Sequence, residues 1–182
     1  FYTTNACYRQ LNEAIVADKE AALWPYMRLI RNINSYLVNH PPQSDITTMR
    51  GTWMSPDTFQ SFRRGNTYRL SQYVSTSAKE SVAADFKGTC LLLFNIPRGC
   101  FNGASIAAVS EYGEDEAEYL LPPYTLVQCI RVDRDAKTIS FDVMVDNRDW
   151  ELRHECLGGA QHGPTTPKNV PYTWHVTAAE IL

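Results

Sequence analysis

The chain changes from helical to strand-like patterning part-way along, and this order limits the folds open to it. Apolar residues recur at helical spacing up to Pro25, at Leu11, Ala14, Ile15 and Ala22, and then from Tyr26 to Leu37 before Pro41-Pro42. Short runs of strand-forming residues follow at 90–96, 105–109, 119–121, 125–132 and 138–145, and the last two are joined by a turn-like 133–136. Helices followed by strands predict an α+β fold rather than alternating βαβ units.

The stretch between these two halves has a mixed composition. Residues 43–68 predict loops around one short strand near Met49. Ser77 and Glu80 have the spacing of a capping box, in which a hydroxyl and a carboxylate satisfy free donors at a helix start. The pattern therefore predicts a helix from Ser77 that ends before Gly88 and turns Val82, Ala83 and Phe86 inward.

Composition excludes several classes of protein. The chain has 182 residues, 44% hydrophobic and 20% charged, which suits one globular domain. A formal net charge of -3 gives no reason to expect nucleic acid, and no apolar run is long enough to span a membrane. The five cysteines form no CxxC pair, so a zinc ribbon is not expected, although one or two disulfides stay open.

Three short motifs contain residues that could take part in catalysis or ligand binding. If Glu118 begins a strand, Glu116 and Glu118 would face the same side, roughly 6–7 Å apart. Glycoside-cleaving enzymes use pairs of carboxylates around an oxocarbenium-like transition state. Ser75 could donate a hydroxyl hydrogen bond that fixes a carboxylate. Arg50 offers a guanidinium to a diphosphate, and Gly51 lets the backbone approach a planar ligand. Each motif alone is more commonly a solvated loop, a helix cap or a surface turn.

In this order the motifs resemble the Arg–Ser–Glu-x-Glu signature of arginine-specific mono-ADP-ribosyltransferases, the ecto-enzyme and toxin-like class. The matching stretches are MRGTW, YVSTSAKESVAADF and EAEYLLPPYTLVQ, with CLLLFNIPRG and ASIAAVSEYGEDE between them and YRQLNEAI near the start. The resemblance covers 1–145 and implies amino-terminal helices packed on two small, mostly antiparallel sheets with an NAD cleft. We therefore expect a catalytic domain at 1–145 and an extension of unknown role at 146–182.

The resemblance also implies the roles of individual residues, with NAD as substrate and no metal. Glu118 would be the catalytic glutamate, positioned by Ser75, while Arg50 would hold the phosphates or ribose of NAD. Gly51 would meet the nicotinamide carboxamide through its backbone. Phe86 is a candidate to stack on the nicotinamide ring, although a core phenylalanine is as good an interpretation.

Glu116 resembles the residue that selects arginine on the target, because a carboxylate can bind a guanidinium bidentately and take its proton. Tyr112 is a candidate contact to the protein substrate. The segment 112–118 is about one residue longer than the pattern of the family, which leaves target choice open. Cys7 and Cys156 could form a disulfide or stay unpaired. His154, Cys156 and His162 fit no standard metal site.

The expected activity is transfer of ADP-ribose from NAD to arginine side chains of target proteins, with release of nicotinamide. Two alternatives stay open: an NAD glycohydrolase that uses water as its main acceptor, and a non-catalytic NAD- or protein-binding module of the same fold. The expected partner is a protein with an accessible arginine, and we expect a monomer. The resemblance favours a secreted or extracellular location, and a cytosolic one stays open.

Overall fold

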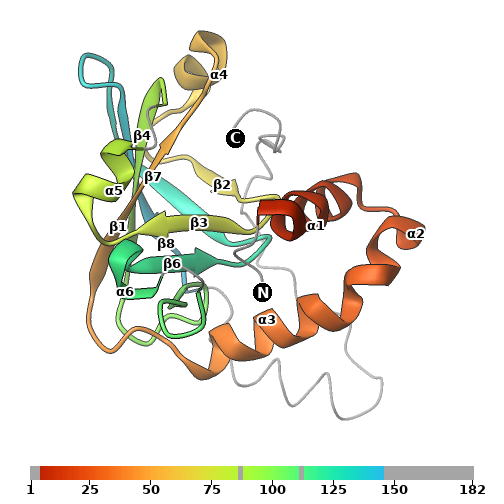
Figure 1. Ribbon diagram of the computed structural model, residues 1–182. Coiled ribbons are helices and arrows are strands. Elements are labelled where there is room, and N and C mark those ends of the chain that lie inside the picture. The colour runs from red at the N-terminus through yellow and green to blue at the C-terminus, as the bar shows by residue number, and fades with distance from the viewer. Residues whose placement is uncertain (1–4, 86–87, 111–112, 146–182) are drawn as a thin grey trace, which may run out of the picture.

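The amino-terminal part of the chain is helical and the remainder is dominated by strands (Figure 1). The computed structural model describes residues 5–85, 88–110 and 113–145. The helices are α1 (Asn5–Ala17), α2 (Glu20–Leu23), η1 (Trp24–Tyr26), α3 (Met27–Asn39), α4 (Pro56–Ser61), α5 (Glu80–Asp85) and α6 (Gly113–Glu116). The strands are β1 (Ile46–Thr52), β2 (Thr67–Arg69), β3 (Val74–Ser77), β4 (Cys90–Ile96), β5 (Ala104–Ser105), β6 (Glu118–Leu121), β7 (Leu126–Asp133) and β8 (Thr138–Val143). The predicted α+β class is confirmed.

The first predicted helix is divided into shorter elements. Leu11, Ala14 and Ile15 are buried on α1, as their spacing predicts. The helix then ends at Ala17 because Asp18 adopts a left-handed backbone with φ of 47°. Ala22 therefore lies on the separate helix α2, in which no residue is buried.

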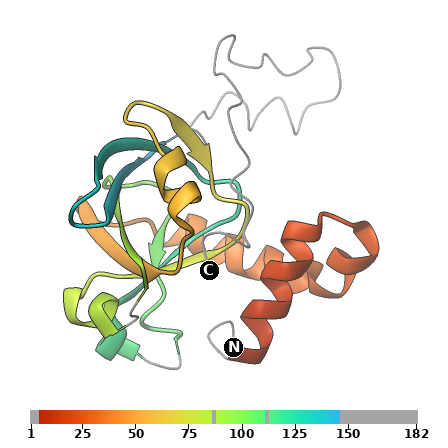
Figure 2. The ribbon, with the colours of Figure 1, turned by 90° about the horizontal axis from the view of Figure 1, so that it is seen from above.

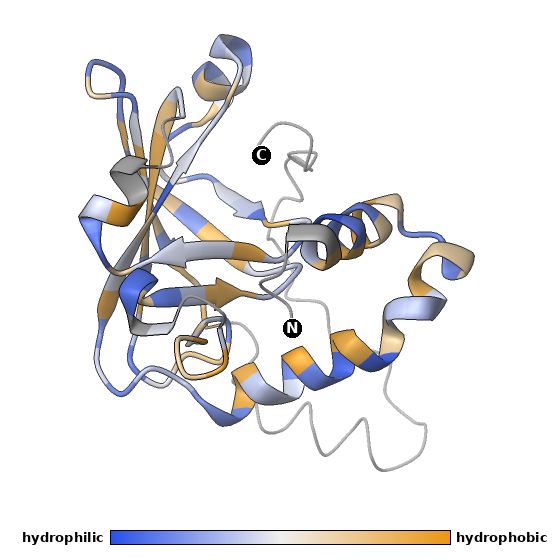
Figure 3. Ribbon diagram, in the orientation of Figure 1, coloured by the Kyte–Doolittle hydropathy of each residue, from blue (hydrophilic) through white to orange (hydrophobic). Residues whose placement is uncertain are grey.

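Apolar residues recur along helix α3 (Figure 3), and its buried side chains pack with residues of the strand region. Ile33 and Leu37 are buried on it, and the helix ends just before the expected stop at Pro41-Pro42. A second view shows the amino-terminal helices on one side of the strands (Figure 2). Together they form one hydrophobic core with side chains from the strand region, namely Tyr73, Ala104, Ile106 and Leu120. Among the helices in the described ranges, none combines the length and apolar character that a bilayer span requires.

Within the described ranges, eight strands form one sheet in the order β2-β7-β8-β4-β1-β3-β6-β5, and only the β4–β8 pair is parallel. β1 meets β3 at a single register pair, Met49 and Ser77. The two small sheets that were expected are therefore the two parts of one sheet, joined at this point. The pairing places the end of β3 between Met49 and Glu118, because Ser77 also pairs with Glu118 of β6.

The larger core consists mainly of side chains from β4, β7 and β8 and also includes Val74 of β3 and Leu121 of β6. Cys90, Leu92, Phe94 and Ile96 of β4 are buried in alternation with half-buried neighbours, as a strand with one covered face requires. The predicted β7–β8 hairpin is confirmed. The strand expected over 105–109 is wrong, because pairing with β6 stops at Ser105 and a turn follows. The sequence prediction also missed α4, β2 and α6.

Asn12 ties α1 to the start of β3. Its side-chain amide donates to the Tyr73 carbonyl at 3.1 Å, and its Oδ1 accepts from the Tyr73 N–H at 3.2 Å. The Asn12 side chain is buried, so these bonds satisfy backbone groups that water does not reach. Helix α1 is thereby held on the strand that continues to Ser75.

Candidate active site

Glu118 is a buried carboxylate with hydroxyl donors on both oxygens. Its side chain is only 6% exposed at the first position of β6. Ser75 Oγ donates to Glu118 Oε1 at 2.5 Å, and Ser110 Oγ donates to Oε2 at 3.0 Å. A buried carboxylate needs such partners, because an unpaired one would lose the solvation that water provides. The bonds give Glu118 one defined orientation.

Ser75 reaches Glu118 because of the register between β3 and β6. Ser77 lies opposite Glu118, so Ser75, two residues earlier, has its side chain on the same face and diagonal to it. The next residue along that face towards the helices is Tyr73, which belongs to the core under α1 and α3. This face of the sheet is therefore apolar at one end and carries the Ser75–Glu118 pair at the other.

Arg50 converges on the same strand. Its Nη1 donates to the backbone carbonyl of Ser75 at 2.8 Å, and the side chain is half-buried. The guanidinium is thus fixed beside the residue whose hydroxyl holds Glu118. Gly51 follows Arg50 on β1, opposite Leu91 of β4. Arg50, Ser75 and Glu118 therefore lie together, on three different strands.

Glu116 approaches Glu118 by a route that differs from the predicted one. It does not lie on a strand with Glu118, because it is the last residue of α6 and Ala117 has a left-handed φ of 43°. Burial and the neighbouring charge of Glu118 both raise the pKa of Glu116. The two carboxylates therefore interact, although a sharp turn rather than strand alternation brings them together.

The segment 115–117 is held by the last residue of β3 and by the turn that follows it. Ser77 Oγ donates to the Glu116 carbonyl at 2.5 Å, and the Ala78 N–H donates to the Ala117 carbonyl at 3.1 Å. Lys79 Nζ donates to the Asp115 carbonyl at 3.1 Å. The left-handed conformation of Ala117 is thus fixed by contacts from a distant part of the chain.

Ser77 is not the helix cap that its spacing predicts. Helix α5 begins only at Glu80, and Ser77 is the last residue of β3. Its hydroxyl accepts from the Lys79 N–H at 2.9 Å and donates to the Glu116 carbonyl. The capping-box prediction is wrong because strand pairing with Glu118 keeps Ser77 extended.

Several predicted residues lie outside the described ranges, namely Phe86, Tyr112, Cys156, His154 and His162. Among the described residues, no group of His, Cys, Asp and Glu side chains could hold a metal ion.

Sequence reasoning missed two residues that build the site. Ser110 donates to Glu118, and Asn12 anchors the strand that carries Ser75. The sequence signal for Ser110 is weak, since it lies eight residues before Glu118 in a segment predicted to follow a strand. Asn12 had a better signal, as a polar residue beside Leu11 on the buried side of a helix.

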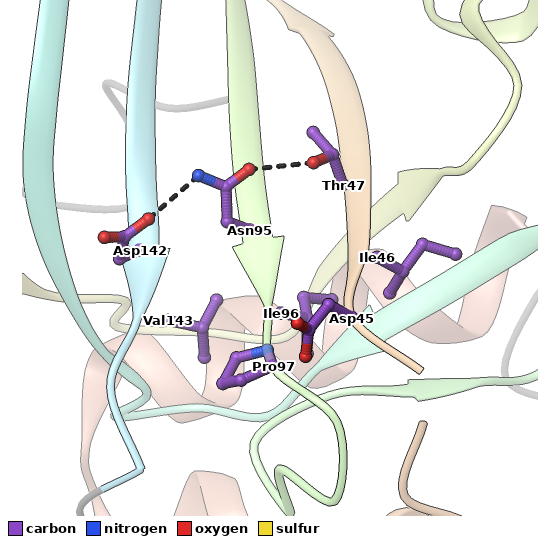
Figure 4. A pocket seen from close by; sticks show the side chains of 8 residues that line it. All are labelled: Asp45, Ile46, Thr47, Asn95, Ile96, Pro97, Asp142 and Val143. Atoms are coloured by element: carbon purple, nitrogen blue, oxygen red, sulfur yellow. Dashed lines mark hydrogen bonds between the residues drawn. The ribbon is translucent and has the colours of Figure 1, made fainter. Parts of the chain in front are cut away.

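A separate hollow of about 410 Å³ lies at the far ends of β1, β4 and β8 (Figure 4). Thr47 Oγ1 donates to Asn95 Oδ1, and Asn95 Nδ2 donates to Asp142 Oδ1, both at 2.8 Å. The lining includes none of the three converging site residues. These two hydrogen bonds link the three polar side chains across β1, β4 and β8, away from Arg50, Ser75 and Glu118.

Comparison with known proteins identifies the family to which this chain is similar. A family model described as NAD:arginine ADP-ribosyltransferase matches residues 1–149. No curated protein matches the chain by sequence.

Solved structures share the fold at low identity. Vis toxin, an ADP-ribosyltransferase from Vibrio splendidus, is 21% identical with a TM-score of 0.63, over 81% of this chain and 71% of that one. An ADP-ribosyltransferase from Clostridium botulinum is 17% identical with a TM-score of 0.63, over 79% and 82%. Exoenzyme S from Pseudomonas aeruginosa is 18% identical with a TM-score of 0.61, over 88% and 80%. These likenesses show that the fold is shared.

Proposed function

The chain belongs to the NAD:arginine ADP-ribosyltransferase family, and we propose that it transfers ADP-ribose from NAD to arginine side chains of target proteins. The observation that carries this proposal is the buried Glu118 carboxylate, held by the Ser75 hydroxyl beside the anchored Arg50. A carboxylate fixed in this way can stabilise positive charge that develops on a sugar as its glycosidic bond breaks.

In the proposed reaction the bond between the ribose C1′ and the nicotinamide nitrogen breaks, and nicotinamide leaves with the electron pair. Glu118 stabilises the oxocarbenium-like ribose. Arg50 holds the phosphates or ribose of NAD, and Gly51 leaves room for the nicotinamide carboxamide near the backbone. An arginine nitrogen of the target then bonds to C1′ and gives its proton to Glu116.

Glu116 is the basis for proposing arginine as the acceptor. A carboxylate can bind a guanidinium through two parallel hydrogen bonds. Its raised pKa makes Glu116 a better proton acceptor than an ordinary glutamate, because proton transfer becomes more favourable as the pKa of the base rises. Two relatives support the proposal: Vis has been solved in complex with agmatine, a guanidine compound, and Exoenzyme S with Carba-NAD and human 14-3-3 protein beta.

The test measures two products of the same incubation with NAD and a model arginine peptide. Chromatography follows nicotinamide, and mass spectrometry follows the ADP-ribosyl peptide. The unmodified protein should yield both products. Glu118→Gln should lose both, since the amide keeps the shape of the side chain and removes its charge. Glu116→Gln should lose the peptide adduct and keep nicotinamide release.

Asp115→Asn is the matched control. It makes the same carboxylate-to-amide change on an exposed neighbour, whose backbone carbonyl accepts a hydrogen bond from Lys79 Nζ. We expect both products to persist in this variant. Undiminished turnover by Glu118→Gln would refute the assignment. Nicotinamide without any peptide adduct would indicate an NAD glycohydrolase, and calorimetric NAD binding without turnover would indicate a binding module.

A further inference from the structure

The Glu118 carboxylate has a second hydroxyl donor outside the three sequence motifs. Ser110 Oγ donates to Oε2 at 3.0 Å, while Ser75 Oγ holds Oε1. Resting on the proposed function, we infer that Ser110 is a second positioning residue for Glu118, and that the two serines together set the plane of the carboxylate.

A second donor changes what the carboxylate can do. The terminal torsion of a glutamate side chain has a broad distribution, so one hydrogen bond leaves the carboxylate plane free to turn. Donors on both oxygens of Glu118 oppose this rotation. The orientation towards a bound sugar is then set before the sugar arrives, which is the arrangement that favours charge stabilisation in a transition state.

The position of Ser110 depends on buried structure rather than on an exposed loop. The Ser110 and Val109 N–H groups donate to the Ile106 carbonyl at 2.8 and 2.9 Å, which forms one tight turn. Ile106 is buried in the core under the amino-terminal helices, and its N–H donates to the Glu118 carbonyl at 2.9 Å. The hydroxyl of Ser110 is thus presented from a turn anchored to the same residue that it positions.

Ser110 and Glu118 also lie at the two ends of the segment that carries Glu116. An effect of Ser110 on Glu118 therefore has to be distinguished from an effect on Glu116. A residue that positions Glu118 affects nicotinamide release whether water or arginine is the acceptor. A residue that matters only for Glu116 affects transfer to arginine alone. The ratio of the two products therefore reports which carboxylate depends on Ser110.

The experiment compares Ser110→Ala, Ser110→Thr and Ser110→Cys by steady-state nicotinamide release, with and without the arginine peptide. Ser110→Ala should lower kcat by about ten-fold to a hundred-fold in both conditions, because it removes a hydrogen bond to a charged group. The KM for NAD should stay nearly unchanged. Ser110→Thr retains the hydroxyl and should restore most of the rate, whereas Ser110→Cys, a weak donor, should fall between them.

Two parallel variants make the outcomes separable. Ser71→Ala is the matched control, since Ser71 Oγ is buried with no hydrogen-bond partner among the described residues, and its kcat should equal that of the unmodified protein. If Glu118→Gln stays active, the proposed function fails. If Glu118→Gln is inactive while Ser110→Ala turns over normally, or loses only arginine transfer, the Ser110 inference alone is overturned. If Ser110→Ala does not fold, Ser110→Thr and Ser110→Cys provide the test, because their side chains differ in donor strength. Equal rates of nicotinamide release for these two variants would overturn the Ser110 inference.

Discussion

Replacing Ser75 with alanine removes one hydroxyl and leaves in place the backbone carbonyl that anchors Arg50. Ser75 Oγ donates to Glu118 Oε1 at 2.5 Å, whereas Arg50 Nη1 bonds to the Ser75 carbonyl. The substitution therefore separates the positioning of the carboxylate from the positioning of the guanidinium. We expect kcat for nicotinamide release to fall while the KM for NAD changes little.

The magnitude follows from the kind of bond that is lost. A hydrogen bond to a charged group contributes about 1.5–3 kcal/mol, and each 1.36 kcal/mol is a factor of ten in rate, so kcat should fall by about 10-fold to 150-fold. The Ser75 bond is shorter than the Ser110 bond, so Ser75→Ala should have the larger effect of the two.

The assay is a titration with NAD in which nicotinamide is quantified by chromatography, after circular dichroism has established that the variant is folded. Ser75→Thr keeps the hydroxyl and suits a strand position, so it should retain much of the rate. Ser71→Ala again serves as the control for loss of a buried hydroxyl. A folded Ser75→Ala variant with unchanged kcat, or one whose loss lies wholly in KM, would refute this reasoning.

Two further predictions concern acidity and stability. Because the pKa of Glu116 is raised, arginine transfer should begin to fall at a higher pH than it would with an ordinary glutamate at this position, and Glu116→Gln should be the more stable protein at neutral pH with an advantage that disappears on acidification. A pH-rate profile of arginine transfer and thermal unfolding at several pH values measure these effects, and an acid limb at the pKa of an ordinary glutamate would contradict the first. Asn12→Ala should destabilise the fold by about 1–3 kcal/mol because it removes two hydrogen bonds to the Tyr73 backbone, and an unchanged urea midpoint would contradict this expectation.

Patterns that depend on burial of one face were predictable from the sequence. The strand over 90–96, the β7–β8 hairpin and the apolar side of α3 all match expectation. Helix α4 was predictable in principle: Ser55 Oγ accepts from the Thr58 N–H and Pro56 occupies the first turn, which is a standard helix start.

The arrangement around Glu118 was only partly predictable. Ser75, Arg50 and Glu118 followed from a resemblance, and the structure brings them together. The left-handed Ala117 could not be predicted, because alanine has no preference for that conformation and contacts from the turn after β3 impose it. Ser110 was missed because its role depends on where a turn lies in space.

The contacts that hold the 115–117 segment involve its backbone rather than its side chains, and this has a consequence for how the sequence of the segment can change. Ser77, Ala78 and Lys79 all donate to backbone carbonyls of that segment. Every amino acid supplies a carbonyl, so replacement of Asp115, Glu116 or Ala117 would leave the acceptors present. Under the proposed roles, selection could therefore change the side chains that meet the acceptor and leave Arg50, Ser75 and Glu118 unchanged.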